Sequence, residues 1–241
     1  MKTGNLVFGR NPVYELLQTN PERITKIYIQ KGVRIDQKIY DRIKEFRIPV
    51  SLVSREKLKS MVGNVNHQGI VARISPIETV SASEIIERVV KNRGIVAVID
   101  HVEDPQNLGN IIRTTEVLGG LGVVIPSRRQ APLSETVVKA SAGAIFHIPV
   151  AVVPNIASFL RNFKKEGGFV VSIEVGGENI FNFKFPFPLA IVIGGEDKGV
   201  SRLTLKESDY VVSIPMKGKT GSLNAASAFA IALAFAVKDM G

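Results

Sequence analysis

Residues 95–100 read Ile95-Val-Ala-Val-Ile-Asp100, and a helical pattern follows over 108–118. Near-continuous Val and Ile runs of this kind are what a strand covered on both faces requires. Similar runs are Gly122-Val-Val-Ile, Phe146-His-Ile-Pro-Val, Phe169-Val-Val-Ser-Ile, Leu189-Ala-Ile-Val-Ile and Tyr210-Val-Val-Ser-Ile. Helical patterns accompany them over 83–91, near Val137, over 156–165 and at the end of the chain. This alternation predicts an α/β fold with a parallel sheet between helical layers.

The front of the chain carries a smaller α/β pattern of its own. The pattern predicts helices over 12–17 and about 37–46, and strands over 24–29, 50–53 and 70–74. A Pro- and Ser-containing stretch then offers a boundary. We therefore expect a small α/β domain over 1–75, a linker over 76–83 and a larger domain over 84–241.

The charge of the chain favours an anionic partner. Lys and Arg total 31 against 22 Asp and Glu, which gives a net charge of +9 and a pI near 9.8. Such a charge attracts nucleic acid over long range, so RNA or DNA is the first partner to consider. The alternative is a basic protein without such a partner, because charge alone does not identify one.

The composition also excludes several kinds of chemistry. The chain has no Cys, which excludes disulfides, thiolate catalysis and cysteine metal sites. His67, His101 and His147 show no metal-ligand spacing, so we expect no metal site. No signal-like segment is evident, and the most apolar stretch, 225–237, is shorter than the roughly 18 residues that span a membrane. We expect a cytoplasmic protein without a membrane partner.

Three polar, glycine-bearing segments follow predicted strands. The first reads Asp104-Pro-Gln-Asn-Leu-Gly-Asn-Ile-Ile-Arg113. Asn107 and Arg113 lie near the beginning of one predicted helix, where free backbone N–H groups favour an anion. An Arg beside such a terminus suits a phosphate. In the purely structural alternative, Asp104 or Asn107 caps the helix and Arg113 makes a surface ion pair.

The second segment reads Ile193-Gly-Gly-Glu-Asp-Lys-Gly199. Its glycines permit a tight loop whose main chain can approach a flat ligand, and Glu196 would project from that loop. The segment matches neither the dinucleotide fingerprint nor the P-loop. The alternative is a turn with a solvated Glu.

The third segment reads Ile214-Pro-Met-Lys-Gly-Lys-Thr-Gly-Ser-Leu-Asn224. A P-loop ending at Thr220 would need Gly at position 213, where Ser213 stands, so a nucleoside triphosphatase is rejected. Ser222 and Asn224 lie at the start of a helix rich in small residues. A capping Ser would explain one of these two residues in structural terms.

Taken together, in this order and spacing, the three segments resemble the motifs of the SpoU-type branch of the SPOUT superfamily. Its members are RNA 2′-O-ribose methyltransferases that use S-adenosyl-L-methionine. Phe8-Gly-Arg-Asn-Pro-Val-Tyr-Glu-Leu-Leu and His67-Gln-Gly-Ile-Val-Ala resemble the small RNA-binding domain of members that modify a guanosine of large-subunit ribosomal RNA. The resemblance covers essentially the whole chain.

The resemblance implies a larger domain with a deep trefoil knot, and a homodimer with active sites at the interface. It also implies a cofactor site built from main chain. The matching positions are Gly194, Gly195, Ile214, Met216 and Leu223. No metal is implied.

The resemblance further implies a set of polar residues around the transferred methyl and the ribose. These are Asn107, Arg113, Glu196, Ser222 and Asn224. The family proposal makes Arg113 the proton acceptor for the 2′-hydroxyl. Because Arg normally stays protonated, holding a phosphate or stabilising the developing oxyanion is physically easier. Glu196 would hold Arg113 or Asn107 in place.

Other functions remain open from the sequence. A transfer RNA substrate is the nearest competitor to ribosomal RNA. A non-catalytic RNA-binding module would use the basic charge and keep the loops as inherited scaffold. An ordinary Rossmann dehydrogenase is disfavoured because the dinucleotide fingerprint is missing.

Overall fold

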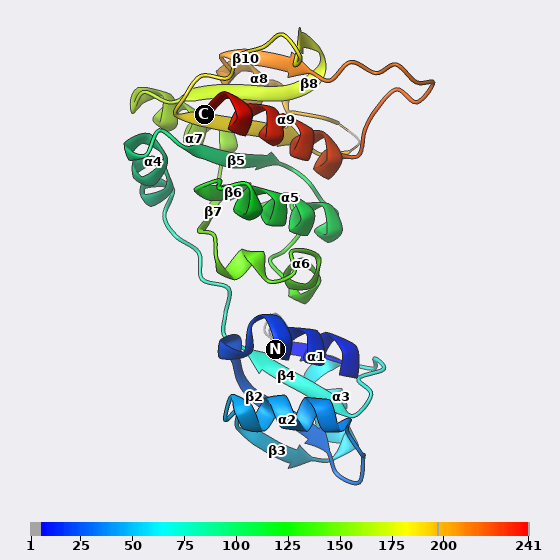
Figure 1. Cartoon of the computed structure of the whole chain (residues 1–241). Helices are drawn as coiled ribbons and strands as arrows, with labels where there is room; N and C mark the ends of the chain where they lie inside the picture. Colours follow the sequence, from blue (N-terminus) through cyan, green and yellow to red (C-terminus); the bar gives the residue numbers. More distant parts are fainter. Residues whose placement is uncertain (1–5, 197, 241) are drawn as a thin grey trace. The chain divides into compact units, whose positions relative to one another are not determined.

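The computed structural model describes residues 6–196 and 198–240. These residues divide into two compact units, each with its own sheet (Figure 1). The first unit contains the chain up to Ile77, and the second contains most of the chain from Glu78 onward.

The first unit is a four-stranded mixed sheet with strand order β1-β4-β2-β3. Strands β2 and β3 are parallel, and β4 runs antiparallel to β1 and β2. The strands are β1 (Leu6–Phe8), β2 (Ile24–Gln30), β3 (Val50–Val53) and β4 (Ile70–Ile74). The helices are α1 (Arg10–Thr19), α2 (Gln37–Glu45) and α3 (Arg55–Val62), with the short turn η1 (Pro21–Arg23). The predicted helices and strands of this region are therefore confirmed, while β1 and α3 were not predicted.

Helix α3 has a weak sequence signal because little of it is buried. Leu58 is its one fully buried residue, and it packs in a small cluster with Tyr28 and Val71. The helix begins after Ser54, whose side chain accepts a hydrogen bond from the Lys57 backbone N–H. Half of its eight residues are charged, and its apolar stripe is only three residues long: Leu58, Met61 and Val62.

The second unit is a six-stranded sheet with order β10-β8-β9-β5-β6-β7, and every pairing in it is parallel. The strands are β5 (Ile95–Asp100), β6 (Gly122–Pro126), β7 (Val150–Val153), β8 (Phe169–Asn179), β9 (Leu189–Gly194) and β10 (Tyr210–Ser213). The predicted parallel sheet is confirmed.

Helices cover both faces of this sheet, as a parallel sheet requires. They are α4 (Ala82–Lys91), α5 (Pro105–Val117), α6 (Glu135–Ala140), α7 (Ile156–Lys165), α8 (Arg202–Glu207) and α9 (Ala225–Met240). Val96 and Val98 of β5 pack with α4 and α7 in one core cluster that includes Phe163. Since successive residues of a strand point to opposite faces, Ala97 belongs to the other face. Helices α5 and α9 pack against one another and against β5 and β9 (Figure 1).

One predicted strand is wrong. Residues 144–146 form the short helical turn η2 (Ala144–Phe146), and β7 starts only at Val150. Gly143 adopts a left-handed conformation, and the N–H groups of Phe146 and His147 donate to carbonyls of the turn. These N–H groups are therefore not free for a strand ladder. Helix α8, which was not predicted, is short and follows the glycine loop after β9.

The sheet brings the three polar segments to one edge. Strands β5, β9 and β10 run parallel and each is followed by one of these segments. The last residues of β5 and β9, Asp100 and Gly194, are register partners. The carboxyl edge of such a sheet is where ligands bind in open α/β folds. Within the described part of the chain, no helix has the length and apolar character needed to cross a membrane.

Candidate active site

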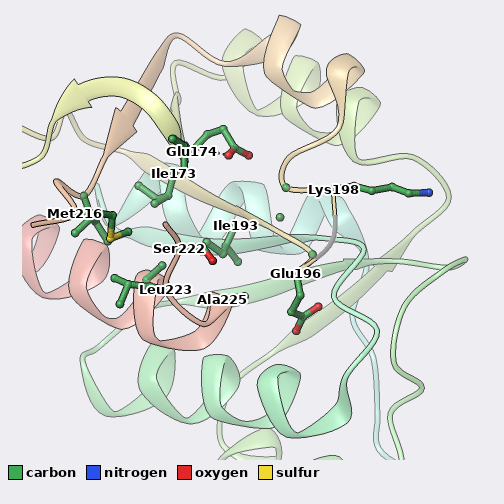
Figure 2. A pocket seen from close by; sticks show the side chains of 15 residues that line it. Ile173, Glu174, Ile193, Glu196, Lys198, Met216, Ser222, Leu223 and Ala225 are labelled. Atoms are coloured by element: carbon green, nitrogen blue, oxygen red, sulfur yellow. Dashed lines mark hydrogen bonds between the residues drawn. The ribbon is translucent and has the colours of Figure 1, made fainter. Parts of the chain in front are cut away.

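A cavity of about 310 Å³ opens at this edge of the second unit (Figure 2). Its walls come from the middle of β8, from the end of β9 and the loop after it, from the segment that joins β10 to α9, and from the start of α9. All of the predicted cofactor-binding residues line it: Gly194, Gly195, Ile214, Met216 and Leu223. Two of the predicted catalytic residues, Glu196 and Ser222, line it as well.

The loop after β9 is folded tightly enough to require glycine. The N–H of Gly199 donates to the carbonyl of Gly195 at 2.9 Å, so the loop turns back on itself. A Cβ atom on Gly194 would overlap the main chain of Gly199, and one on Gly195 would overlap the carbonyl oxygen of His101. The main chain therefore forms this wall of the cavity without side chains in between, as the two adjacent glycines indicated.

A hydrogen-bonded chain of side chains joins all three polar segments. The side-chain amide of Asn107 donates to Oε1 of Glu196. The side-chain amide of Asn224 donates to Oδ1 of Asn107 at 2.8 Å. Asn107 is buried, with 6% of its surface exposed. Since the buried amide of Asn107 is held from both sides, its orientation is fixed.

Of the predicted helix caps, the one by Asp104 is confirmed and the one by Ser222 is not. Oδ1 of Asp104 accepts from the N–H of Gln106 at 2.9 Å and caps α5, so Asn107 is free for the network. Oδ1 of Asn224 accepts from the N–H groups of Ala226 and Ser227 at 3.0 and 3.2 Å, and therefore caps α9. The interpretation of Ser222 as the cap is wrong, because Asn224 takes that position.

Arg113 stands apart from this chain of side chains. It lies on α5 six positions after Asn107, about 9 Å along the helix axis and on a different face. It is exposed, and among the described residues no hydrogen bond or ion pair of its guanidinium is found. Glu196 therefore holds Asn107 and not Arg113. The guanidinium is available to a ligand that arrives from outside the chain.

Two acidic residues at this edge were not singled out from the sequence. Glu174 lines the cavity from the middle of β8, and Asp100 is fully buried at the end of β5. Both follow directly on an apolar run, which is the signal that would have found them. Within the described parts of the chain, no group of His, Asp and Glu could hold a metal ion.

A second cavity, of about 760 Å³, lies in the first unit. Its basic lining residues are Arg10, Arg55 and Lys59. The amides of Gln30, Asn64, Asn66 and Gln68 line it too. Arg10 is partly engaged, because its guanidinium donates to the carbonyl of Arg34 at 2.9 Å. Cations combined with amides suit an anionic ligand that also offers hydrogen-bonding edges.

The pKa of His67, in the wall of this second cavity, is affected by the positive charge of the cavity. Only 5% of the His67 surface is exposed, and its Nδ1 accepts a hydrogen bond from the N–H of Gly69 at 3.1 Å. Burial lowers the pKa of His67 from 6.5, and the nearby charges of Arg55 and Lys59 lower it further. The ring is therefore neutral, since an Nδ1 that accepts a hydrogen bond carries no proton.

Comparison with protein families gives two matches that together span most of the chain. Residues 94–234 match the model of the SpoU rRNA methylase family. Residues 6–80 match the model described as the RNA 2′-O ribose methyltransferase substrate-binding domain. The second match covers the basic cavity, and the first covers the three polar segments.

Similar proteins agree with these matches. A putative TrmH family tRNA/rRNA methyltransferase of Staphylococcus haemolyticus is 39% identical over 228 residues, covering 92% of this chain and 91% of that protein. One of Bacillus subtilis is 37% identical over 227 residues, covering 92% and 90%.

Solved structures show the same fold. The SpoU methyltransferase AviRb of Streptomyces viridochromogenes, in complex with AdoMet, has a TM-score of 0.75 at 24% identity, covering 99% of this chain and 91% of that one. An AdoMet-bound rRNA methyltransferase of Sinorhizobium meliloti has a TM-score of 0.72 at 23% identity, covering 99% and 88%. At these identities the likeness establishes the fold alone.

Proposed function

Because the chain belongs to the SpoU rRNA methylase family, we propose that it transfers a methyl group from S-adenosylmethionine to a ribose 2′-hydroxyl of RNA. Membership makes it an RNA methyltransferase of the group that modifies transfer or ribosomal RNA. The finer proposal is carried by one observation. The hydrogen-bonded side chains of Asn224, Asn107 and Glu196 link all three polar segments, and Glu196 lies in the wall of the cavity.

The cavity suits the cofactor of this family. Its volume of about 310 Å³ is in the range of small-molecule sites, and its walls combine apolar side chains with exposed main chain. The residues that would hold the cofactor are Gly194, Gly195, Ile214, Met216 and Leu223. When bound, S-adenosylmethionine supplies a methyl group that its sulfonium already makes electrophilic.

The polar residues would then orient the acceptor ribose. Glu196 and Asn224 fix the Asn107 amide, and we assign this group, with Ser222, to the ribose side of the site. Arg113 would hold an RNA phosphate or stabilise the developing oxyanion, since its guanidinium stays protonated. Holding the 2′-oxygen in line with the methyl group accounts for most of the acceleration in such a site.

The proposed substrate is a guanosine of large-subunit ribosomal RNA. Two observations support it. One is the resemblance of segments 8–17 and 67–72 to the RNA-binding domain of members that modify such a guanosine. The other is the basic, amide-lined cavity of the first unit. Transfer RNA is the second candidate, because relatives are described as tRNA/rRNA methyltransferases. We also propose a homodimer with active sites at its interface and a cytoplasmic location. The trefoil knot stays a prediction, which strand order alone does not test.

Mapping of 2′-O-methyl groups tests this proposal. RNA from cells with and without the protein is compared over all ribosomal and transfer RNA. A 2′-O-methyl group lost from one large-subunit guanosine supports the proposal, and one lost from transfer RNA supports the second candidate. A methyl group lost from a base would contradict ribose methylation. Titration of the purified chain with S-adenosylmethionine distinguishes these two methyltransferase functions from a non-catalytic RNA-binding module, which would not bind the cofactor.

A further inference from the structure

The glycine loop after β9 is held by carboxylates from both neighbouring strands. In the sheet, β9 lies between β8 and β5. Glu174 follows the part of β8 that pairs with β9, and Asp100 ends β5. Oε2 of Glu174 accepts a hydrogen bond from the N–H of Val200 at 2.8 Å. Oδ2 of Asp100 accepts one from the N–H of Ser201, also at 2.8 Å. Two consecutive amides at the end of the loop are thus bound by two acids.

The two acids differ in their surroundings. Asp100 is fully buried, and its other oxygen lies 2.6 Å from Nδ1 of His101. Glu174 is only partly buried, and its other oxygen accepts from the N–H of Val175 at 3.0 Å. Glu174 also lines the cofactor cavity, whereas Asp100 does not. Of the two acids, Glu174 is the one in direct reach of a cavity ligand.

The loop leaves no spare room around the Glu174 carboxylate. Gly199 has a left-handed backbone with φ of 60°, and a Cβ atom there would overlap Oε2 of Glu174. Figure 2 shows the Glu174 side chain reaching from β8 toward the part of the loop that carries Lys198. The carboxylate therefore packs directly against the loop and forms the cavity wall together with it.

We propose that Glu174 is a cofactor-positioning residue. By accepting a hydrogen bond from the N–H of Val200, it holds the end of the glycine loop in its cofactor-binding shape. The glycines that let the main chain approach the ligand also leave the loop many other conformations. A loop that reaches its binding shape only part of the time binds proportionately more weakly. A hydrogen bond to an ionised acceptor is the stronger kind, so its loss has a measurable effect. The inference rests on the proposed function in one respect, that this cavity holds S-adenosylmethionine.

Calorimetric titration of the full chain with S-adenosylmethionine, without RNA, tests the proposal. Glu174→Ala removes both acceptor oxygens, and Glu174→Gln keeps one neutral acceptor oxygen. Glu178→Ala is the matched control, because Glu178 is an exposed acid on the same strand and is absent from the cavity wall. We expect about tenfold or weaker binding for Glu174→Ala, which corresponds to one charge-assisted hydrogen bond. Glu174→Gln has one acceptor oxygen for the two N–H groups of Val175 and Val200, so its affinity should lie between those of wild type and Glu174→Ala. The Glu178→Ala control should bind as wild type does.

Circular dichroism melting shows that each variant is folded at the temperature of titration. If Glu174→Ala does not fold, Glu174→Asp replaces it, because the shorter side chain keeps the charge but withdraws the carboxylate from the Val200 N–H. Binding by Glu174→Ala equal to that of Glu178→Ala would overturn the proposal. A wild-type chain that binds no S-adenosylmethionine would instead contradict the proposed function.

Discussion

The side-chain amide of Asn224 donates to the side-chain oxygen of Asn107 at 2.8 Å, although 117 positions separate them in the chain. The same Asn224 caps α9 through its other side-chain atom, Oδ1. One residue therefore has a structural role and a site role that use different atoms. Because the two roles use different atoms, substitution can separate them.

Asn224→Asp should keep the cap and break the network. An Asp accepts hydrogen bonds from the first turn of α9 as Asn does, so the melting temperature should stay close to that of wild type. The carboxylate has no donor for Asn107, whose own amide cannot reverse without losing Glu196. We expect the rate of methyl transfer to fall about tenfold or more. Asn224→Ala is the comparison, since it should also lose about 1 kcal/mol of stability with the cap. An Asp variant of full activity would contradict the role given to this network.

Arg113→Ala should abolish methyl transfer and leave cofactor binding intact. Arg113 is exposed and lies outside the cavity wall, so its loss changes nothing that the cofactor would contact. The lost group would be one that binds an RNA phosphate or the developing oxyanion, for which a loss of roughly 10²-fold or more is typical. Single-turnover rates with RNA and calorimetry with S-adenosylmethionine give the two readouts.

Arg113→Lys separates charge from shape in the same assay. Lys keeps the positive charge but loses the planar fork that binds phosphate in two places. An activity between those of wild type and Arg113→Ala is expected. If the Ala variant turns over normally, the catalytic role of Arg113 is wrong.

The strands of the large sheet were predictable because their signal is local. In runs such as 95–100 and 189–193 nearly every residue is apolar, so burial on both faces can be predicted without knowing which strands they pair with. Short elements with one buried residue, such as α3, carry almost no such signal. The strand predicted over 146–150 was placed too early, because Phe146 belongs to a helical turn that follows the left-handed Gly143 and β7 starts only at Val150.

For the site, the sequence predicted which residues belong together but not how they pair. Glu196 was expected to hold either Arg113 or Asn107, and only the fold decides in favour of Asn107. The bond from Val200 to Glu174 likewise depends on β8 lying beside β9, which no local pattern encodes. The hydrogen-bond partners of these side chains depend on the order of the strands in the sheet, so they can be identified only from the three-dimensional structure.

Removing cations from the basic cavity should weaken RNA binding and its salt dependence. The double variant Arg55→Ala/Lys59→Ala loses two lining charges. If both contact phosphates, the slope of log affinity against log salt should become shallower by roughly 1.5. Lys44→Ala/Lys57→Ala is the control, because both lysines are exposed in the same unit, lie outside the cavity wall and carry the same total charge. Filter binding over a series of salt concentrations measures the slopes. Equal slopes for the two double variants would show that only total charge matters.

The pKa of His67 should respond to RNA at this cavity. In the free protein, burial and the charges of Arg55 and Lys59 keep the pKa of His67 below 6.5. Folding therefore favours the neutral ring. The stability that this contributes is fully present above pH 6.5 and is lost as the pH falls through the lower folded value. A bound phosphate offsets the two cations, so the pKa should rise.

Proton NMR of the His67 ring over pH 4.5–8, with and without a short RNA, measures this shift. His101 and His147 lie outside the cavity wall and serve as internal references. In Arg55→Ala/Lys59→Ala the free pKa should already be higher, because two of its three causes are gone and only burial remains. RNA should then shift it less than in wild type. An RNA that binds tightly without moving the His67 pKa would place the phosphate contacts elsewhere on the protein.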